Sequence, residues 1–361
     1  MIETHPFGTA PDGRPVTVYE LAAGTTRVRV MDFGATLVGV DVPDASGATA
    51  DVLLGFGELD GYFGNPSNYG ATIGPVANRT DRGEVPIAGT VYQLPKNDGP
   101  TKDNNLHSDL DHGLHKHMWD AEVDDAANAV RFTCTLADGE LGLPGNRTFT
   151  AEYALVSDED GAAVLTLTYG CTTDAETYVN MTNHSYFNMG GHASGSCLNE
   201  LVRIRAERFL PLREDSVSTG EVREVAGTPF DFRTAKALGT NIEADDEQLH
   251  RAHGYDHCFC VDGYQTDATT PRPALTAEDP ASGRVLDIAI TAPGAHLYAG
   301  NWMDDKDAKD GTTYTPRDGF AFEPEFWPDC VHHDDWEHPV CTPEHPFRTQ
   351  IVYRFSATAR A

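Results

Sequence analysis

Short runs in which apolar and polar residues alternate recur along most of this 361-residue chain, and they restrict its fold more than any other feature. Alternation with a period of two is the pattern of a strand that buries one face. The runs are rich in Val, Thr, Phe and Tyr, which suit a pleated, half-buried surface. We predict strands over residues 27–30, 37–42, 130–136, 148–156, 164–169, 285–290 and 350–355.

Turn-forming residues separate these runs, because the chain contains 34 glycines and 22 prolines. Helical periodicity is nearly absent, and only residues 245–252 predict a helix, which is short. Many short strands with frequent turns predict an all-β fold, a large antiparallel sandwich or barrel with very little helix. No repeat or linker divides the chain, so we expect a single domain over residues 1–361, with 304–310 as a surface loop.

The balance of charge excludes several classes of partner. The chain has 56 acidic and 26 basic residues, a net charge of −30, and such a surface repels phosphate backbones and anionic lipids. We therefore expect no nucleic acid and no membrane partner. Seven scattered cysteines without a CxxC motif, and a start without a basic and apolar leader, favour a cytoplasmic protein with reduced thiols. A monomer and a homodimer fit the sequence equally well.

The segment Thr182–Asn188 reads Thr-Asn-His-Ser-Tyr-Phe-Asn and follows an extended apolar stretch. It surrounds His184 with hydrogen-bonding side chains. A histidine held by fixed polar neighbours is a common form of general acid or base near neutral pH. The segment therefore makes His184 a candidate for proton transfer.

A second segment, Phe322–Asp329, places two carboxylates among aromatic residues. Pro324 favours extended backbone at Glu323, and alternation then puts Glu323 and Glu325 on one face of a strand. Burial would raise the pKa of both groups and produce a general base. In so acidic a chain, a solvent-exposed acidic edge is the competing interpretation.

Further polar segments carry weaker signals when each is taken alone. Asn78-Arg79 offers donors for hydroxyls or carboxylates, but Arg79 suits a structural ion pair equally well. His107 and Asp256 lie in turn-like segments, where such residues more often make local hydrogen bonds. The spacing of His112, His115 and His117 does not match a metal site.

Taken in order, these segments resemble the aldose 1-epimerase family, the galactose mutarotases, along nearly the whole chain. Ala77-Asn78-Arg79 is similar to the family's Ala-Asn-Arg motif, and Thr182–Asn188 to its second histidine motif. The other similar segments are Asn105-Leu106-His107, Gly254-Tyr255-Asp256-His257, and Glu323 with Pro328-Asp329. The resemblance implies a galactose mutarotase-like supersandwich and an enzyme that interconverts the anomers of a free hexose.

The resemblance also implies roles for single residues. Glu323 would take the proton from the anomeric hydroxyl and His184 would protonate the ring oxygen, with no metal and no cofactor. The residues implied in sugar binding are His107, Arg79, Asn78, Asp256 and His296. Two other readings stay open: a catalytically silent carbohydrate-binding protein on the same fold, and an epimerase of a modified hexose.

The chain departs from the family pattern at four positions. Pro75 stands where the family often has Arg, and Ser108 where many members have Gly. His296 and Glu325 each replace a Gln. If Glu325 lies close to Glu323, its charge would raise the pKa of Glu323.

Overall fold

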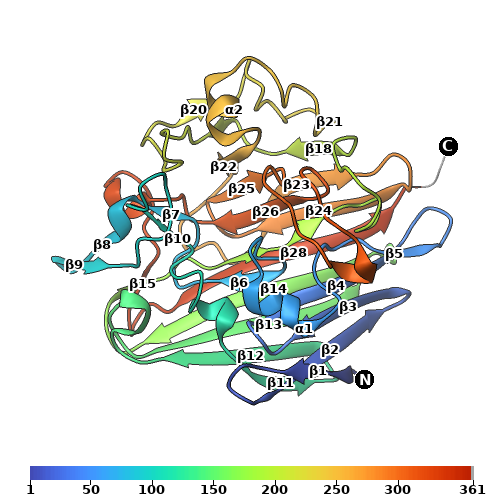
Figure 1. Ribbon diagram of the computed structural model, residues 1–361, viewed down its shortest axis with the longest axis horizontal. Helices are drawn as coiled ribbons and strands as arrows, with labels where there is room; N and C mark the ends of the chain where they lie inside the picture. Colours follow the sequence, from blue (N-terminus) through green and yellow to red (C-terminus); the bar gives the residue numbers. More distant parts are fainter. Residues whose placement is uncertain (359–361) are drawn as a thin grey trace.

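In the computed structural model, which describes residues 1–358, the largest element is a nine-stranded sheet in which every neighbouring pair is antiparallel (Figure 1). Its strands are, in spatial order, β11 (Asp120–Asp124), β12 (Ala129–Leu136), β13 (Arg147–Ser157), β14 (Ala163–Thr173), β28 (Phe347–Ala357), β24 (Arg284–Ile290), β23 (Arg272–Glu278), β18 (Leu201–Ile204) and β21 (Lys236–Ala237). The C-terminal strand β28 lies between β14 and β24. Residues from both halves of the chain therefore build one sheet.

A six-stranded antiparallel sheet carries several of the candidate site residues. Its order is β17 (Tyr186–Phe187), β26 (Phe320–Glu325), β25 (Gly294–Tyr298), β22 (Asp256–Cys260), β19 (Arg208–Phe209) and β20 (Arg223–Glu224). Four two-stranded pairs complete the connections: β6 (Ala71–Ile73) with β16 (Thr182–His184), β7 (Arg79–Thr80) with β10 (Asn105–Leu106), β8 (Glu84–Ile87) with β9 (Thr90–Gln93), and β15 (Thr177–Tyr178) with β27 (Val340–Cys341).

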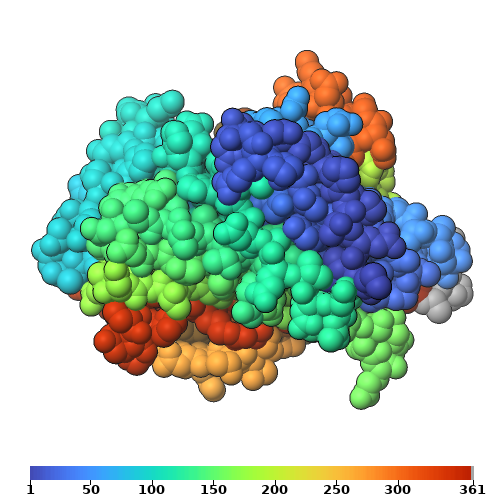
Figure 2. All heavy atoms as spheres, turned by 90° about the horizontal axis from the view of Figure 1, so that it is seen from below, coloured from blue at the N-terminus to red at the C-terminus, as the bar shows by residue number. Residues whose placement is uncertain are grey.

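The N-terminal residues form a separate five-stranded sheet of β1 (Glu3–Thr9), β2 (Pro15–Ala23), β3 (Thr26–Met31), β4 (Thr36–Pro43) and β5 (Thr49–Asp51). The rings of Phe132 on β12 and Tyr19 on β2 meet edge to face, with ring centroids 5.5 Å apart and an interplanar angle of 76°. Figure 2 shows the N-terminal region beside the segment from about residue 110 to 160 on one face of the molecule. Aromatic packing therefore joins the N-terminal sheet to the large sheet.

The main hydrophobic core draws its side chains from alternating strand positions, as the sequence pattern predicts. Along β13, buried residues alternate with partly exposed ones from Arg147 to Leu155. Phe149, Tyr153, Leu165 and Tyr353 are fully enclosed in this core. The predicted all-β fold is confirmed.

Helices are few within the described residues. The predicted helix is α2 (Glu247–Ala252), and the carboxylate of its N-cap residue Asp246 accepts hydrogen bonds from the backbone of Gln248 and Leu249. Sequence analysis missed α1 (Leu59–Gly64). Five 3₁₀ turns are η1 (Asp81–Gly83), η2 (Leu114–Lys116), η3 (Glu140–Gly142), η4 (Lys309–Gly311) and η5 (Cys330–His332). No helix in residues 1–358 is both long and apolar enough to cross a membrane, and all seven cysteines are free thiols.

Candidate active site

Two segments that are far apart in the sequence meet in the lining of a pocket. His184 lies at the end of β16 and Glu323 lies in the middle of β26. The His184 Nε2 and Glu323 Oε2 atoms are 3.4 Å apart, and the two side chains are only 7% and 3% exposed. The fold thus brings an imidazole and a carboxyl group close enough for proton transfer.

The local sequence explains how β26 presents its acidic residues. The strand is extended through Pro324, and Glu323 pairs in register with His296 on β25. Glu323 and Glu325 are 2% and 0% exposed. The buried interpretation of these carboxylates is therefore correct, and the exposed acidic edge is wrong.

Burial controls the protonation of the Glu323–His184 pair. Burial, followed by the charge of Asp256, raises the pKa of Glu323 well above its usual range. Burial lowers the pKa of His184 to about 4. Both effects favour a neutral carboxylic acid beside a neutral imidazole. This form has the same number of protons as an ion pair, so moving one proton across the 3.4 Å contact converts one into the other.

A second histidine stands against the first and has a fixed tautomer. The His107 and His184 ring centroids are 5.3 Å apart. The backbone N–H of Asn78 donates to His107 Nδ1 at 3.1 Å, and burial, followed by the charge of His184, lowers the pKa of His107 well below its usual value. The neutral ring must therefore carry its hydrogen on Nε2. His107 is a hydrogen-bond donor from that atom.

This tautomer bears on metal binding. His107, His184 and Glu323 place ligand-type atoms within 4.8 Å of one another. A metal ligand must offer a lone pair, yet Nδ1 of His107 is occupied by an N–H donor and Nε2 carries the hydrogen. The group therefore suits a hydroxyl oxygen, which can accept from His107 Nε2, better than a metal ion. Histidines 112, 115 and 117 form no comparable group in the described chain.

One wall of the pocket is an ionic network around Asp256. His296 Nε2 lies 2.7 Å from Asp256 Oδ1, and Arg79 Nη1 lies 3.9 Å from Asp256 Oδ2. Arg79 Nε also donates to Asp98 at 2.8 Å. Although burial opposes it, the hydrogen bond from His296, together with the charge of Arg79, lowers the pKa of Asp256 to about 2. Asp256 is therefore an ionised acceptor.

His296 and Asn78 belong to the same wall, and their polar atoms are occupied by other groups of the protein. The Asn78 side-chain amide lies 3.0 Å from His296 Nδ1 and donates to Glu325 Oε1 at 3.0 Å. Both nitrogens of His296 thus have partners within the protein. The sequence predicts His296 as a sugar-binding residue, and in this geometry it holds Asp256 in place.

The pocket has a volume of about 340 Å³, within the range of small-molecule sites. All the predicted site residues line it: Asn78, Arg79, His107, His184, Asp256, His296 and Glu323. Tyr186 and the 65%-exposed Trp302 also line it. Sequence analysis missed Asn68, Ser216, Arg251 and Tyr298, since none belongs to a motif that marks it.

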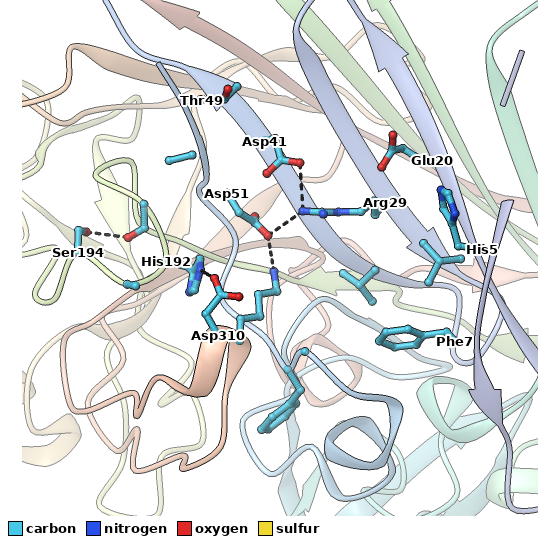
Figure 3. A pocket seen from close by; sticks show the side chains of 18 of the residues that line it. His5, Phe7, Glu20, Arg29, Asp41, Thr49, Asp51, His192, Ser194 and Asp310 are labelled. Atoms are coloured by element: carbon cyan, nitrogen blue, oxygen red, sulfur yellow. Dashed lines mark hydrogen bonds and ion pairs between the residues drawn. The ribbon is translucent and has the colours of Figure 1, made fainter. Parts of the chain in front are cut away.

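A larger cavity of about 800 Å³ lies over the outer face of the N-terminal sheet (Figure 3). Arg29 Nη2 contacts Asp51 at 3.0 Å and Asp41 at 3.2 Å, and Lys309 Nζ lies 2.8 Å from Asp51. Lys309 also donates to the Leu53 carbonyl at 2.7 Å. These ion pairs fasten the 304–312 segment to the sheet, with Lys309 only 8% exposed. The prediction of a simple surface loop at 304–310 is therefore wrong at Lys309, which is buried and pairs with the partly buried carboxylate of Asp51.

The departures from the family pattern have distinct surroundings. Pro75 is buried and does not line the pocket. Ser108 has a left-handed backbone with φ of 64°, and its hydroxyl both accepts from the Val76 N–H at 2.7 Å and donates to the Val76 carbonyl at 3.1 Å. The Ser108 hydroxyl thereby braces the turn that precedes Asn78. The other two departures, His296 and Glu325, meet at Asn78.

Stacked antiparallel sheets with a buried carboxyl–imidazole pair in a polar pocket define a β-sandwich protein equipped for acid–base chemistry. Residues 17–354 match the family model described as aldose 1-epimerase. The galactose mutarotase of Homo sapiens is 35% identical over 97% of both chains, and the aldose 1-epimerase of Escherichia coli (strain K12) is 32% identical over 96% of this chain and 97% of its own. The chain belongs to the aldose 1-epimerase family.

Solved structures agree with this assignment. An aldose epimerase homologue from C. elegans superposes with a TM-score of 0.83 and 26% identity, covering 94% of this chain and 99% of its own. The galactose 1-epimerase of Lactobacillus acidophilus NCFM gives a TM-score of 0.82 and 26% identity, covering 99% of both chains. The family and the fold that the sequence resembles are both confirmed.

Proposed function

We propose that the protein is an aldose 1-epimerase, an isomerase that interconverts the α and β anomers of a free hexose, galactose or glucose or both. The observation that carries the proposal is the 3.4 Å contact between His184 and Glu323 in the lining of the polar pocket. The names and close similarity of its relatives support the same reaction.

The reaction needs one base and one acid on two oxygens that share the anomeric carbon. Glu323, as carboxylate, takes the proton of the anomeric hydroxyl, and that oxygen becomes the aldehyde oxygen. The bond from the anomeric carbon to the ring oxygen breaks, and the ring oxygen takes its electron pair and the proton of His184. The aldehyde group then rotates about the bond that joins it to the next carbon. When the ring closes again, His184 acts as the base and Glu323 as the acid, and the other anomer forms. The pair returns to its starting protonation state.

The remaining pocket residues would hold the ring. In this proposal His107 donates from Nε2, the guanidinium of Arg79 donates to hydroxyl oxygens, and ionised Asp256 accepts from hydroxyl groups. Asn78 and His296 line the same wall and orient these groups. No step in this scheme calls for a metal or a redox cofactor.

Three broader expectations stay part of the proposal. We propose that residues 1–361 form one domain, and the main core supports this because it runs from Ile2 to Phe355. A net charge of −30 supports the absence of nucleic acid and membrane partners. Seven free cysteines support a reducing cytoplasm.

The proposal is tested by polarimetry on freshly dissolved α-galactose and α-glucose. Wild type should speed the approach to anomeric equilibrium over buffer, and Glu323→Gln and His184→Asn should each lower turnover by about 100-fold or more. The exposed variants Glu159→Gln and His112→Asn are matched controls and should keep wild-type rates. A wild-type protein that leaves both sugars at the buffer rate would end the proposal.

A further inference from the structure

Glu325 is a fully buried acid that the proposed reaction does not use. It lies on β26, two residues after Glu323, and it is 0% exposed. Its partner in register is Gly294 on β25, where an added Cβ would meet Trp327 at 2.8 Å and Cys258 at 2.9 Å. The carboxyl group of Glu325 is therefore enclosed in tightly packed protein.

The hydrogen bonds of Glu325 are too few for a buried charge. Its Oε1 accepts from the Asn78 side-chain amide at 3.0 Å, and its Oε2 has no hydrogen-bond partner. Its Oε1 also lies 3.6 Å from His296 Nδ1. Because Asn78 donates to that nitrogen, His296 offers no proton there. A single donor from a neutral amide is weak compensation for an ionised carboxylate.

The charges around Glu325 also favour its neutral form. The titratable groups that face it come from β26, β25, β22, β7, β15 and η5: Glu323, His296, Asp256, Cys258, Arg79, Tyr178 and Cys330. Arg79 is the only permanent cation among them, and it already pairs with Asp98 at 2.8 Å and faces Asp256. Burial, followed by the negative charge that Glu323 carries when it is ionised, accordingly raises the pKa of Glu325 well above its usual range.

A neutral Glu325 fixes the orientation of Asn78. One amide hydrogen of Asn78 goes to Glu325 and the other to His296, while its Oδ1 accepts from the Arg79 backbone at 2.8 Å. The backbone N–H of Asn78 sets the His107 tautomer. His296 in turn holds Asp256. Asn78 thus links Glu325 to two groups of the pocket.

We propose that Glu325 is a positioning residue that works as a neutral carboxylic acid, holding Asn78 so that His107 and Asp256 face the sugar correctly. The inference rests on the proposed epimerase function for its kinetic consequences, but the protonation of Glu325 is independent of activity. A protonated glutamate has nearly the shape of glutamine, and both can accept at Oε1. Glutamine at position 325 should therefore still hold Asn78, whereas a side chain without a hydrogen-bond acceptor should not.

The kinetic test compares Glu325→Gln with Glu325→Leu. We expect Glu325→Gln to keep kcat/KM within about threefold of wild type, with both limbs of the pH profile in place. Glu325→Leu leaves a buried Asn78 N–H unpaired and should lower kcat/KM by about tenfold or more, mainly through KM. The proposal is overturned if Glu325→Leu is unimpaired or Glu325→Gln is equally damaged. It is also overturned if the alkaline limb of Glu325→Gln moves about one unit lower, because wild-type Glu325 would then be charged.

Infrared difference spectroscopy tests the protonation without using activity. At neutral pH in D₂O, the spectrum of wild type minus Glu325→Gln should contain the C=O stretching band of a protonated carboxylic acid. The appearance of a carboxylate band in its place would refute the proposal. This measurement also separates the two hypotheses: a wild type without epimerase activity would overturn the proposed function, and the infrared band would still decide the state of Glu325.

Discussion

In the proposed reaction one proton moves between Glu323 and His184, and this exchange suits a reaction that runs in both directions. Ring opening and ring closure need the acid and base to exchange roles, and a pair separated by 3.4 Å can do so without a change in net charge. Burial lowers the pKa of His184 and raises that of Glu323. The pair should therefore hold one proton over a wide range of pH.

At the residue scale, this predicts the pH dependence of kcat/KM. As pH falls, the Glu323–His184 pair gains a second proton at the lowered pKa of His184. The acid limb, where kcat/KM declines, should therefore lie near pH 4. Loss of the last proton follows the raised pKa of Glu323, so the alkaline limb should lie well above the usual glutamate range. Initial rates corrected for the buffer reaction at each pH measure both limbs. An acid limb near 6.5, the ordinary histidine value, would contradict this assignment.

At the scale of elements, short strands and buried polar links place the site. β16 is three residues long and is held by pairing with β6, while β26 is held by β25. Another link joins the segment after β17 to the start of β18: Glu200 is 2% exposed and accepts from the backbone N–H of Met189 at 2.7 Å. Burial raises the pKa of Glu200 to about 8.

This link predicts a pH-dependent stability. The folded pKa of Glu200, about 8, lies above its ordinary value of 4.5, so the folded state binds the extra proton. The stabilisation is complete below pH 4.5 and is lost as pH rises through 8. Between these values, the unfolding free energy of wild type relative to Glu200→Gln should fall by at most about 1.4 kcal/mol per pH unit. Urea unfolding of both proteins at several pH values measures it, and a constant difference would contradict the prediction.

At the scale of the whole molecule, the nine-stranded sheet joins strands from both halves of the chain. β28 pairs with β14 on one side and with β24 on the other, so the large sheet is complete only when the C-terminal strand is in place. The same molecule carries a net charge of −30. Mutual repulsion of these charges opposes the compact state.

Screening this repulsion should raise the melting temperature. Added NaCl shortens the distance over which surface charges interact, so Tm at neutral pH should increase with salt in calorimetry. The control is the same salt series near the isoelectric point, where the net charge is close to zero and the increase should largely vanish. A Tm that does not respond to salt at neutral pH would show that self-repulsion contributes little to the stability of this fold.

The sequence predicted the long strands well and the short ones poorly. Alternation is visible in β13 and in β14, each of which is eleven residues long. The two residues of β7 are too few to show a period. Motifs likewise marked His184, Glu323 and Asp256. Asn68 and Tyr298 reach the same pocket from segments with no motif, because only the packing of distant strands brings them there.

The sequence by itself determined the class of fold and marked His184 and Glu323 as the candidates for proton transfer, because side-chain period and sequence motifs are local properties of the chain. The tertiary structure alone decided which of these groups carry charge. Packing of distant strands buries Glu323, His184 and Glu325. It also pairs Arg79 with Asp98. The hydrogen bond from the Asn78 backbone that sets the His107 tautomer likewise joins two separate segments. Desolvation and hydrogen-bond partners control a pKa, and both exist only after the sheets have packed.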